Sequence, residues 1–142
     1  MILPDLNLLI YAYNDDAPEH APAKTWWESC LSETRPVGLP WAVMLGYVRL
    51  ITGRVAMVDP FSARDAIGHV RSWLERPQVE ILTPGPRHLD LVDSLMRDAQ
   101  ASGNLAMDAH LAALAIEHGA EIHSNDADFS RFPGLRWINP LA

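Results

Sequence analysis

The chain has 142 residues; 49% are hydrophobic, and 18 acidic against 11 basic residues give a formal net charge of −7. This length predicts a single domain, residues 1–142, large enough to bury its own core. Taken alone, the net charge argues against nonspecific binding to nucleic acid. The single cysteine, Cys30, excludes a disulfide framework and a cysteine-rich zinc site, and we expect it to be a small buried residue.

The sequence shows no targeting or membrane-spanning segment. Its first five residues, Met1-Ile2-Leu3-Pro4-Asp5, contain neither a basic region nor a long apolar run, so they predict no signal peptide. No window reaches 18 uncharged apolar residues. We therefore expect a cytoplasmic protein without a membrane partner.

The first half of the chain alternates short apolar segments with helical patterns. A buried strand at 2–4 ends at Asp5, and Pro4 makes it short or irregular. A second strand is predicted at 36–40, with helices at 6–14, 19–33, 40–52 and 61–76. One stripe of the third helix carries Trp41, Leu45, Val48 and Thr52. Ser62 is the expected N-cap of the fourth helix.

The second half repeats the alternation. Strands are predicted at 79–83, 120–124 and 135–139, helices at 88–101 and 102–119, and a loop or short helix at 125–132. The helix at 88–101 is amphipathic, with Leu89, Val92, Leu95, Met96 and Ala99 expected to face inward. Apolar strands between helices are typical of an α/β fold. We expect a three-layer sandwich whose central parallel sheet has about four to five strands.

One carboxylate interrupts an apolar helix. Asp108 is the only charge within the alanine-rich run 105–116, and its helical face is otherwise apolar at Leu111, Ala112 and Ala115. A carboxylate in such surroundings is costly unless it is paired, hydrogen-bonded or bound to a metal. An N-capping role does not fit, because a cap precedes the apolar run and does not lie within it.

Other acids follow the predicted strands. Asp5 comes directly after the first strand and Asp126 after the strand at 120–124. Because ligands of parallel sheets lie beyond the carboxyl ends of the strands, these two side chains and Asp108 are expected to converge there. Local roles remain open, since Asp5 caps the following helix equally well, and Asp126 and Asp128 suit a turn.

Converging carboxylates stay ionised together mainly when a cation shares their site. Oxygen ligands alone suit Mg²⁺, with Mn²⁺ as the alternative, and either ion would activate a water to attack a phosphodiester. Asn7 and Ser124 are the side chains expected to hold a water or to orient a carboxylate. The six histidines lack the spacing of a zinc site, and no glycine-rich phosphate loop is present.

Four stretches of the sequence are distributed from one end of the chain to the other, at residues 4–12, 41–52, 103–119 and 124–135. They resemble a PIN-domain ribonuclease and, more narrowly, the VapC toxin of a bacterial toxin–antitoxin pair. The resemblance implies an Mg²⁺-dependent endoribonuclease that forms a homodimer and is neutralised by a VapB-type antitoxin. It also implies that Asp5 and Asp108 ligate the metal and that Asp126 completes the cluster, with Asp128 at a more variable position.

The sequence departs from this family at one position. The family usually carries a glutamate in the helix after the second strand, where this chain has Gly46, and no Asp or Glu occurs anywhere in 34–58. The departure predicts either a three-acid site or one that takes a ligand from water or from elsewhere in the chain, with weaker metal binding. It also supports the alternative function, a catalytically impaired PIN-like module that only binds RNA or a partner.

RNA would still have to approach an acidic protein. Arg49 and Arg131 are the candidates to meet its phosphates at the mouth of the site. Two other α/β classes fit less well. A response-regulator receiver domain needs a late lysine, but Lys24 is the only one here, and a haloacid-dehalogenase-type phosphatase needs Asp where Asn7 stands.

Overall fold

The computed structural model describes all residues, 1–142. Its strands are β1 (Ile2–Pro4), β2 (Val37–Pro40), β3 (Val79–Leu82), β4 (Glu121–His123) and β5 (Trp137–Ile138). Its helices are α1 (Leu6–Tyr13), α2 (His20–Ser32), α3 (Trp41–Ile51), α4 (Ala63–Leu74), α5 (His88–Asp98) and α6 (Leu105–His118), with a short 3₁₀ helix η1 (Ala127–Arg131). These elements match the predicted order, and most boundaries lie within three residues of those predicted from the sequence.

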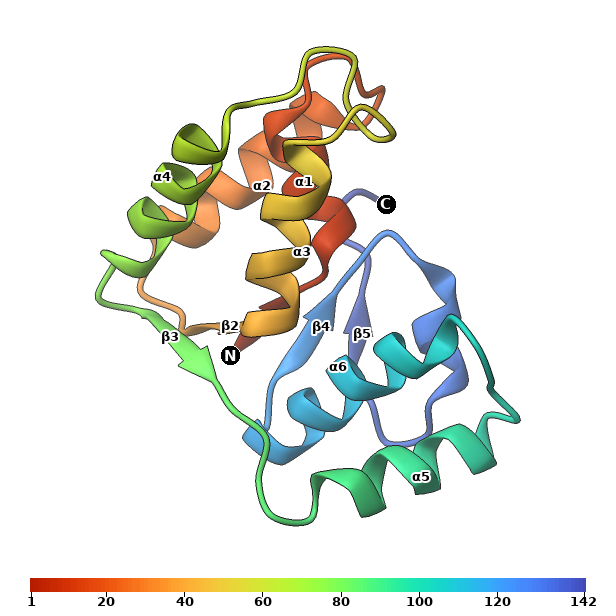
Figure 1. Ribbon diagram of the computed structural model, residues 1–142. Coiled ribbons are helices and arrows are strands. Elements are labelled where there is room, and N and C mark those ends of the chain that lie inside the picture. The colour runs from red at the N-terminus through yellow and green to blue at the C-terminus, as the bar shows by residue number, and fades with distance from the viewer.

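All five strands form one parallel sheet in the order β3-β2-β1-β4-β5. The strands run between two groups of helices, α1–α4 on one side and α5 with α6 on the other (Figure 1). The predicted three-layer α/β sandwich is therefore confirmed, with five strands. Because β1 and β4 are neighbours, the loops that follow them open at the same edge of the sheet.

The central strands are buried and the edge strands are partly exposed. Every residue of β1, β2 and β4 is buried, whereas Glu80 and Ile81 of β3 and Ile138 of β5 face solvent. Pro4 pairs with His123 at the last position of the central strand β1. Proline donates no backbone hydrogen bond, and β1 is correspondingly short, with the chain leaving the sheet at Asp5.

Two details of the helices differ from the sequence-based expectation. Leu89 was expected to face inward, but it is 78% exposed, because α5 is an outer helix that buries only Leu95 completely. Trp41 and Leu45 of the predicted α3 stripe are also exposed, and the buried face of α3 instead carries Val43, Met44, Tyr47 and Ile51. The N-cap at Ser62 is confirmed, since its hydroxyl accepts the backbone N–H of Asp65 at 3.1 Å.

Aromatic side chains join α1, α2, α3 and α4. Trp27, Tyr47 and Trp73 are fully buried, and the Trp73 indole donates to the hydroxyl of Tyr13 at 2.9 Å. Cys30 is buried beside this layer, and burial raises the pKa of its thiol to about 12, as expected for an unreactive packed cysteine. No helix is both long and apolar enough to cross a membrane.

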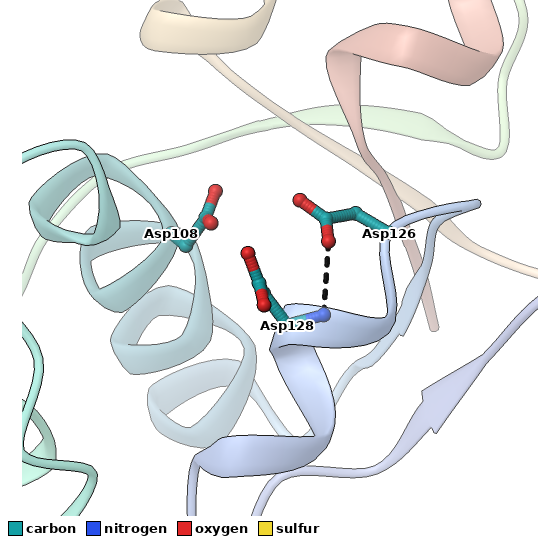
Figure 2. Close-up of side chains that lie close together, drawn as sticks. All are labelled: Asp108, Asp126 and Asp128. Atoms are coloured by element: carbon teal, nitrogen blue, oxygen red, sulfur yellow. Dashed lines mark hydrogen bonds between the residues drawn. The ribbon is translucent and has the colours of Figure 1, made fainter.

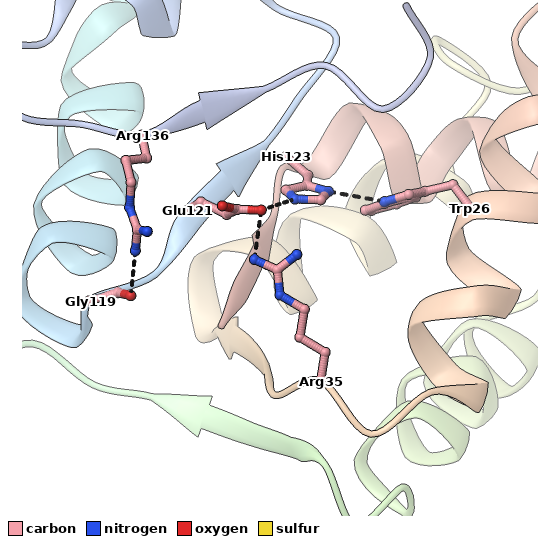
Figure 3. Close-up of polar contacts among 6 residues, drawn as sticks. All are labelled: Trp26, Arg35, Gly119, Glu121, His123 and Arg136. Atoms are coloured by element: carbon pink, nitrogen blue, oxygen red, sulfur yellow. Dashed lines mark hydrogen bonds and ion pairs between the residues drawn. The ribbon is translucent and has the colours of Figure 1, made fainter.

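A buried polar network occupies one face of β4 (Figure 3). The indole of Trp26 donates to Nδ1 of His123 at 3.1 Å, so that nitrogen carries no proton and Nε2 donates to Glu121 at 2.9 Å. Arg35 pairs with the same Glu121 oxygen at 2.7 Å. Burial lowers the pKa of His123, consistent with this neutral tautomer. The network ties β4 to α2 and to the segment before β2.

Two glycines provide a matched test of the packing. A Cβ atom at Gly38 of β2 would lie 2.5–3.0 Å from three atoms of the buried Leu82 side chain, whereas one at Gly68 of α4 would meet nothing within 4 Å. We expect Gly38→Ala to lower the free energy of unfolding by about 1–3 kcal/mol through overpacking. Gly68→Ala should raise it by about 0.5–1 kcal/mol because alanine favours the helix. Urea denaturation of both variants measures these changes, and equal stabilities would contradict the close β2–β3 packing.

Candidate active site

Three separate elements carry the acids of the site. Asp5 is the N-cap of α1 and accepts the backbone N–H of Leu6 at 2.8 Å. Asp108 lies in the first turn of α6, where the positive end of the helix dipole favours a carboxylate. Asp126 follows β4 and caps η1 by accepting the N–H of Asp128 at 2.9 Å. The capping roles of Asp5 and Asp126 are therefore real, and each cap leaves a second carboxylate oxygen for another partner.

Ser124 connects two of these acids. Its side chain is fully buried, and its hydroxyl donates to Oδ2 of Asp5 at 2.7 Å. The Ser124 hydroxyl oxygen in turn accepts the backbone N–H of Asp126 at 2.9 Å. Ser124 thus orients the carboxylate after β1 and the loop after β4 at once, the orienting role expected of it.

The three closest acids are Asp108, Asp126 and Asp128. One carboxylate oxygen from each lies within 4.8 Å of the others, a group that could hold a metal ion. Figure 2 shows Asp108 pointing from α6 toward the loop that carries the other two. Asp128 was expected to play a secondary part, whereas here it completes this group. Asp5, more deeply buried, is not part of it.

The charges of the acids are coupled. Burial, and then the nearby carboxylates of Asp5, Asp126 and Asp128, raise the pKa of Asp108 to about 6. Burial also raises the pKa of Asp5, although the hydrogen bonds from Ser124 and Leu6 oppose that shift. Ionisation of Asp108 and Asp5 therefore costs free energy in the absence of a cation, and a divalent ion would offset that cost.

The remaining candidates divide into those near the acids and those placed elsewhere. Asn7 is the second residue of α1, two positions after Asp5, and its Oδ1 atom is buried without a hydrogen-bond partner. Arg49 is exposed on the last turn of α3. Arg131 instead donates to the backbone oxygen of Ala99 at 2.9 Å, which holds η1 against the end of α5. That contact favours a structural role for Arg131.

Gly46 has a specific neighbour. A Cβ atom there would lie 2.9 Å from Cδ2 of Leu6, the first residue of α1. The leucine side chain therefore occupies the space into which an acid at position 46 would begin. The sequence could have indicated the part of Asp128, because Asp126 and Asp128 stand two residues apart in a turn, but the spacing alone does not show which of them faces Asp108.

The fold, with its acids beyond the ends of β1 and β4, is that of a known class of protein. Residues 2–135 match the PIN domain, and the chain belongs to that family. Among sequence relatives it is 42% identical to Ribonuclease VapC33 of Mycobacterium tuberculosis over 99% of both chains. It is 39% identical to Ribonuclease VapC37 of the same organism, over 100% of this chain and 99% of the relative.

Solved structures share the fold at lower identity. VapC20 of M. tuberculosis, described as a toxin that cleaves the sarcin-ricin loop, has a TM-score of 0.67 and 21% identity, covering 96% of this chain and 99% of that one. VapBC2 of Rickettsia felis, solved with a promoter DNA fragment, has a TM-score of 0.71 and 18% identity, covering 98% of each chain.

The raised pKa of Asp108 generates a stability prediction. The folded chain holds this proton up to about pH 6, against an ordinary value of 3.8, so ionisation of Asp108 costs stability as pH rises from about 4 to about 6. Removing the charge by Asp108→Asn should therefore stabilise the metal-free protein at pH 7.5. Because solvent screens the charge of this half-buried group, we expect the free energy of unfolding to rise by only about 1 kcal/mol, which raises the melting temperature by about 3 °C.

Thermal melts in EDTA at pH 4 and 7.5 measure this effect. The gain should be much smaller at pH 4, where the folded state still holds the proton and the unfolded state holds it in part. Asp90→Asn, at an exposed site on α5, is the control and should show no such pH-dependent gain. An Asp108→Asn variant that is less stable than the native chain at pH 7.5 would contradict the coupling of these charges.

Proposed function

We propose that this protein is a metal-dependent endoribonuclease that acts as the toxin of a toxin–antitoxin pair. The observation that carries the proposal is the group of Asp108, Asp126 and Asp128, with carboxylate oxygens within 4.8 Å of one another in a PIN domain. The names of the VapC ribonucleases that share 39–42% of its sequence support an RNA substrate.

The donor set fits a hard divalent cation. All the ligand atoms are carboxylate oxygens, which suit Mg²⁺ or Mn²⁺ and not the softer metals that prefer sulfur or imidazole. Asp108, Asp126 and Asp128 would hold the ion, with Asp5 completing the negative field around it. When bound, such an ion supplies a Lewis acid and generates a nucleophile from water at neutral pH.

The other residues prepare this arrangement. Ser124 holds Asp5 and the Asp126 loop in fixed relative positions, so the carboxylates need little rearrangement to take up the ion. The first turn of α6 places the positive end of a helix beside the acids, which reduces their mutual repulsion. Arg49 is the side chain proposed to meet RNA phosphates, since Arg131 is bound to Ala99.

The partners follow from the same assignment. The R. felis neighbour is a VapBC assembly, which supports a VapB-type antitoxin as the protein partner of this chain. We also propose that the protein is a homodimer in the cytoplasm, the state and place implied by its resemblance to VapC toxins.

A binding module without catalysis is the second candidate function. The glycine at position 46 favours it, because α3 offers no acid to the site and Leu6 fills the space. The two candidates make opposite predictions for RNA treated with metal.

The nuclease proposal predicts cleavage that needs both a metal and the central acid. Purified protein free of antitoxin should cut total RNA with Mg²⁺ or Mn²⁺ and not with EDTA. Asp108→Asn and Asp5→Asn should each lower the rate by about a hundredfold or more, since each alters the charge that holds the ion. Asp90→Asn should cut like the native chain. Absence of cutting with every metal would favour the binding module.

Placing an acid at position 46 of α3 tests whether the glycine there weakens metal binding. In Gly46→Glu the new Cβ meets only the flexible end of Leu6, which can rotate away, so the protein should fold. We expect Mn²⁺ affinity, measured by calorimetry, to rise about tenfold, because a further carboxylate faces the ion. Gly46→Gln, which has the same shape without the charge, is the control. Equal affinities of the two variants would show that position 46 does not reach the metal.

A further inference from the structure

A small cavity opens beside the catalytic acids. Its volume is about 310 Å³, at the lower end of the range that takes small ligands. Asp5 and Asp126 are part of its wall, so it adjoins the acidic site. The rest of its wall comes from the outer face of α1 and from Leu50 near the end of α3.

The wall combines apolar, aromatic and amide groups. Leu6, Ile10 and Leu50 provide apolar surface, and Tyr11 provides the aromatic ring. Asn7 contributes a side-chain amide whose Oδ1 is buried without a partner, although the residue as a whole is partly exposed. Rotation of the amide about χ2 exchanges the places of its oxygen and nitrogen, so it can present either a donor or an acceptor to the cavity.

A nucleobase has the complementary chemistry. Its flat faces stack on aromatic and apolar side chains, and its edge carries the donors and acceptors that an amide reads. A bound base edge would also give the Asn7 amide the partner it lacks. The four residues from α1 recur three and four positions apart, so they share one helical face.

The position suits the nucleotide next to the cleaved phosphate. Asp5 caps α1 and Tyr11 stands six residues further on, about 9 Å along the helix axis. A phosphate held at the acids therefore leaves its adjoining base within reach of the tyrosine ring.

The charge of its wall distinguishes this cavity from a larger one elsewhere in the protein. A cavity of about 630 Å³ near the end of α1 has five carboxylates in its wall and Lys24 as its only lysine. Such a wall repels RNA. In the cavity beside the site the two carboxylates are those of Asp5 and Asp126, whose charge a bound cation offsets, and the other residues are neutral.

We propose that Tyr11, Asn7 and the apolar wall around them form a base-binding subsite that selects the nucleotide beside the cleaved phosphate. The proposal rests on the ribonuclease function, and it assigns sequence preference to α1. Tyr11 stacks on the base, and Asn7 reads its edge.

Binding is tested without cleavage. The probes are the four ribonucleoside 5′-monophosphates, which contain no phosphodiester to cleave, added with Mg²⁺ to isotopically labelled protein and followed by NMR. At least one of them should shift the signals of the Asn7 side-chain amide and of Tyr11. Tyr11→Ala should weaken that binding by about ten- to hundredfold, the usual effect of losing one stacked base. Tyr11→Phe keeps the ring and should recover most of the affinity.

Sequence preference is tested on a random-sequence RNA pool cut in the presence of Mn²⁺, with the cut ends sequenced. The native chain should favour one base at a fixed distance from the cut, and Tyr11→Ala should flatten that preference without changing Mn²⁺ affinity. Leu89→Ala, an exposed apolar site on α5, is the control and should keep the native preference.

The outcomes distinguish the two proposals. If Tyr11→Ala keeps the native base preference and nucleotide affinity, the subsite is wrong while the nuclease stands. If the native chain cuts nothing but Tyr11→Ala loses nucleotide binding, the nuclease is wrong while the subsite stands. If no nucleotide shifts the Tyr11 or Asn7 signals and no base is preferred, the subsite is overturned.

Discussion

The site depends on one buried hydroxyl. Ser124 donates to Asp5 and accepts from the backbone of Asp126, so a single oxygen fixes the ends of β1 and β4 relative to each other. Its position is possible only because the two strands are parallel neighbours whose chains leave the sheet at the same edge. On the other face of β4, His123 and Glu121 bind side chains from α2 and from the segment before β2, which anchors the same strand from behind.

The acids form a centre whose electrostatic cost suits metal binding. Desolvation and neighbouring carboxylates raise the pKa of Asp108, so the ionised form of this side chain destabilises the metal-free fold. The charge that destabilises the metal-free fold at this residue is also the charge that the proposed divalent cation would need. The dipole of α6 and the bonds from Ser124 reduce this cost without removing the charge.

Gly46 links the proposed metal site to the neighbouring cavity. The absence of a side chain at position 46 lets Leu6 pack against α3, and Leu6 also forms part of the wall beside Asp5. The loss of one acid and the shape of the proposed base subsite are thus one structural feature. The third carboxylate of the close group comes from Asp128.

The sequence by itself determined the order of strands and helices along the chain and the parallel α/β class, and it predicted Asp5, Asp108 and Asp126 as the acids of the site. It could do so because periodicity and chain breakers are local, and because parallel strands send their following loops to one edge. It could not show that Asp128 rather than Asp5 stands in the closest group, that Arg131 is held by Ala99, or that Leu89 faces solvent. Those facts depend on which side chains from distant segments meet, and only the packing of α6, η1 and α5 against the sheet decides them.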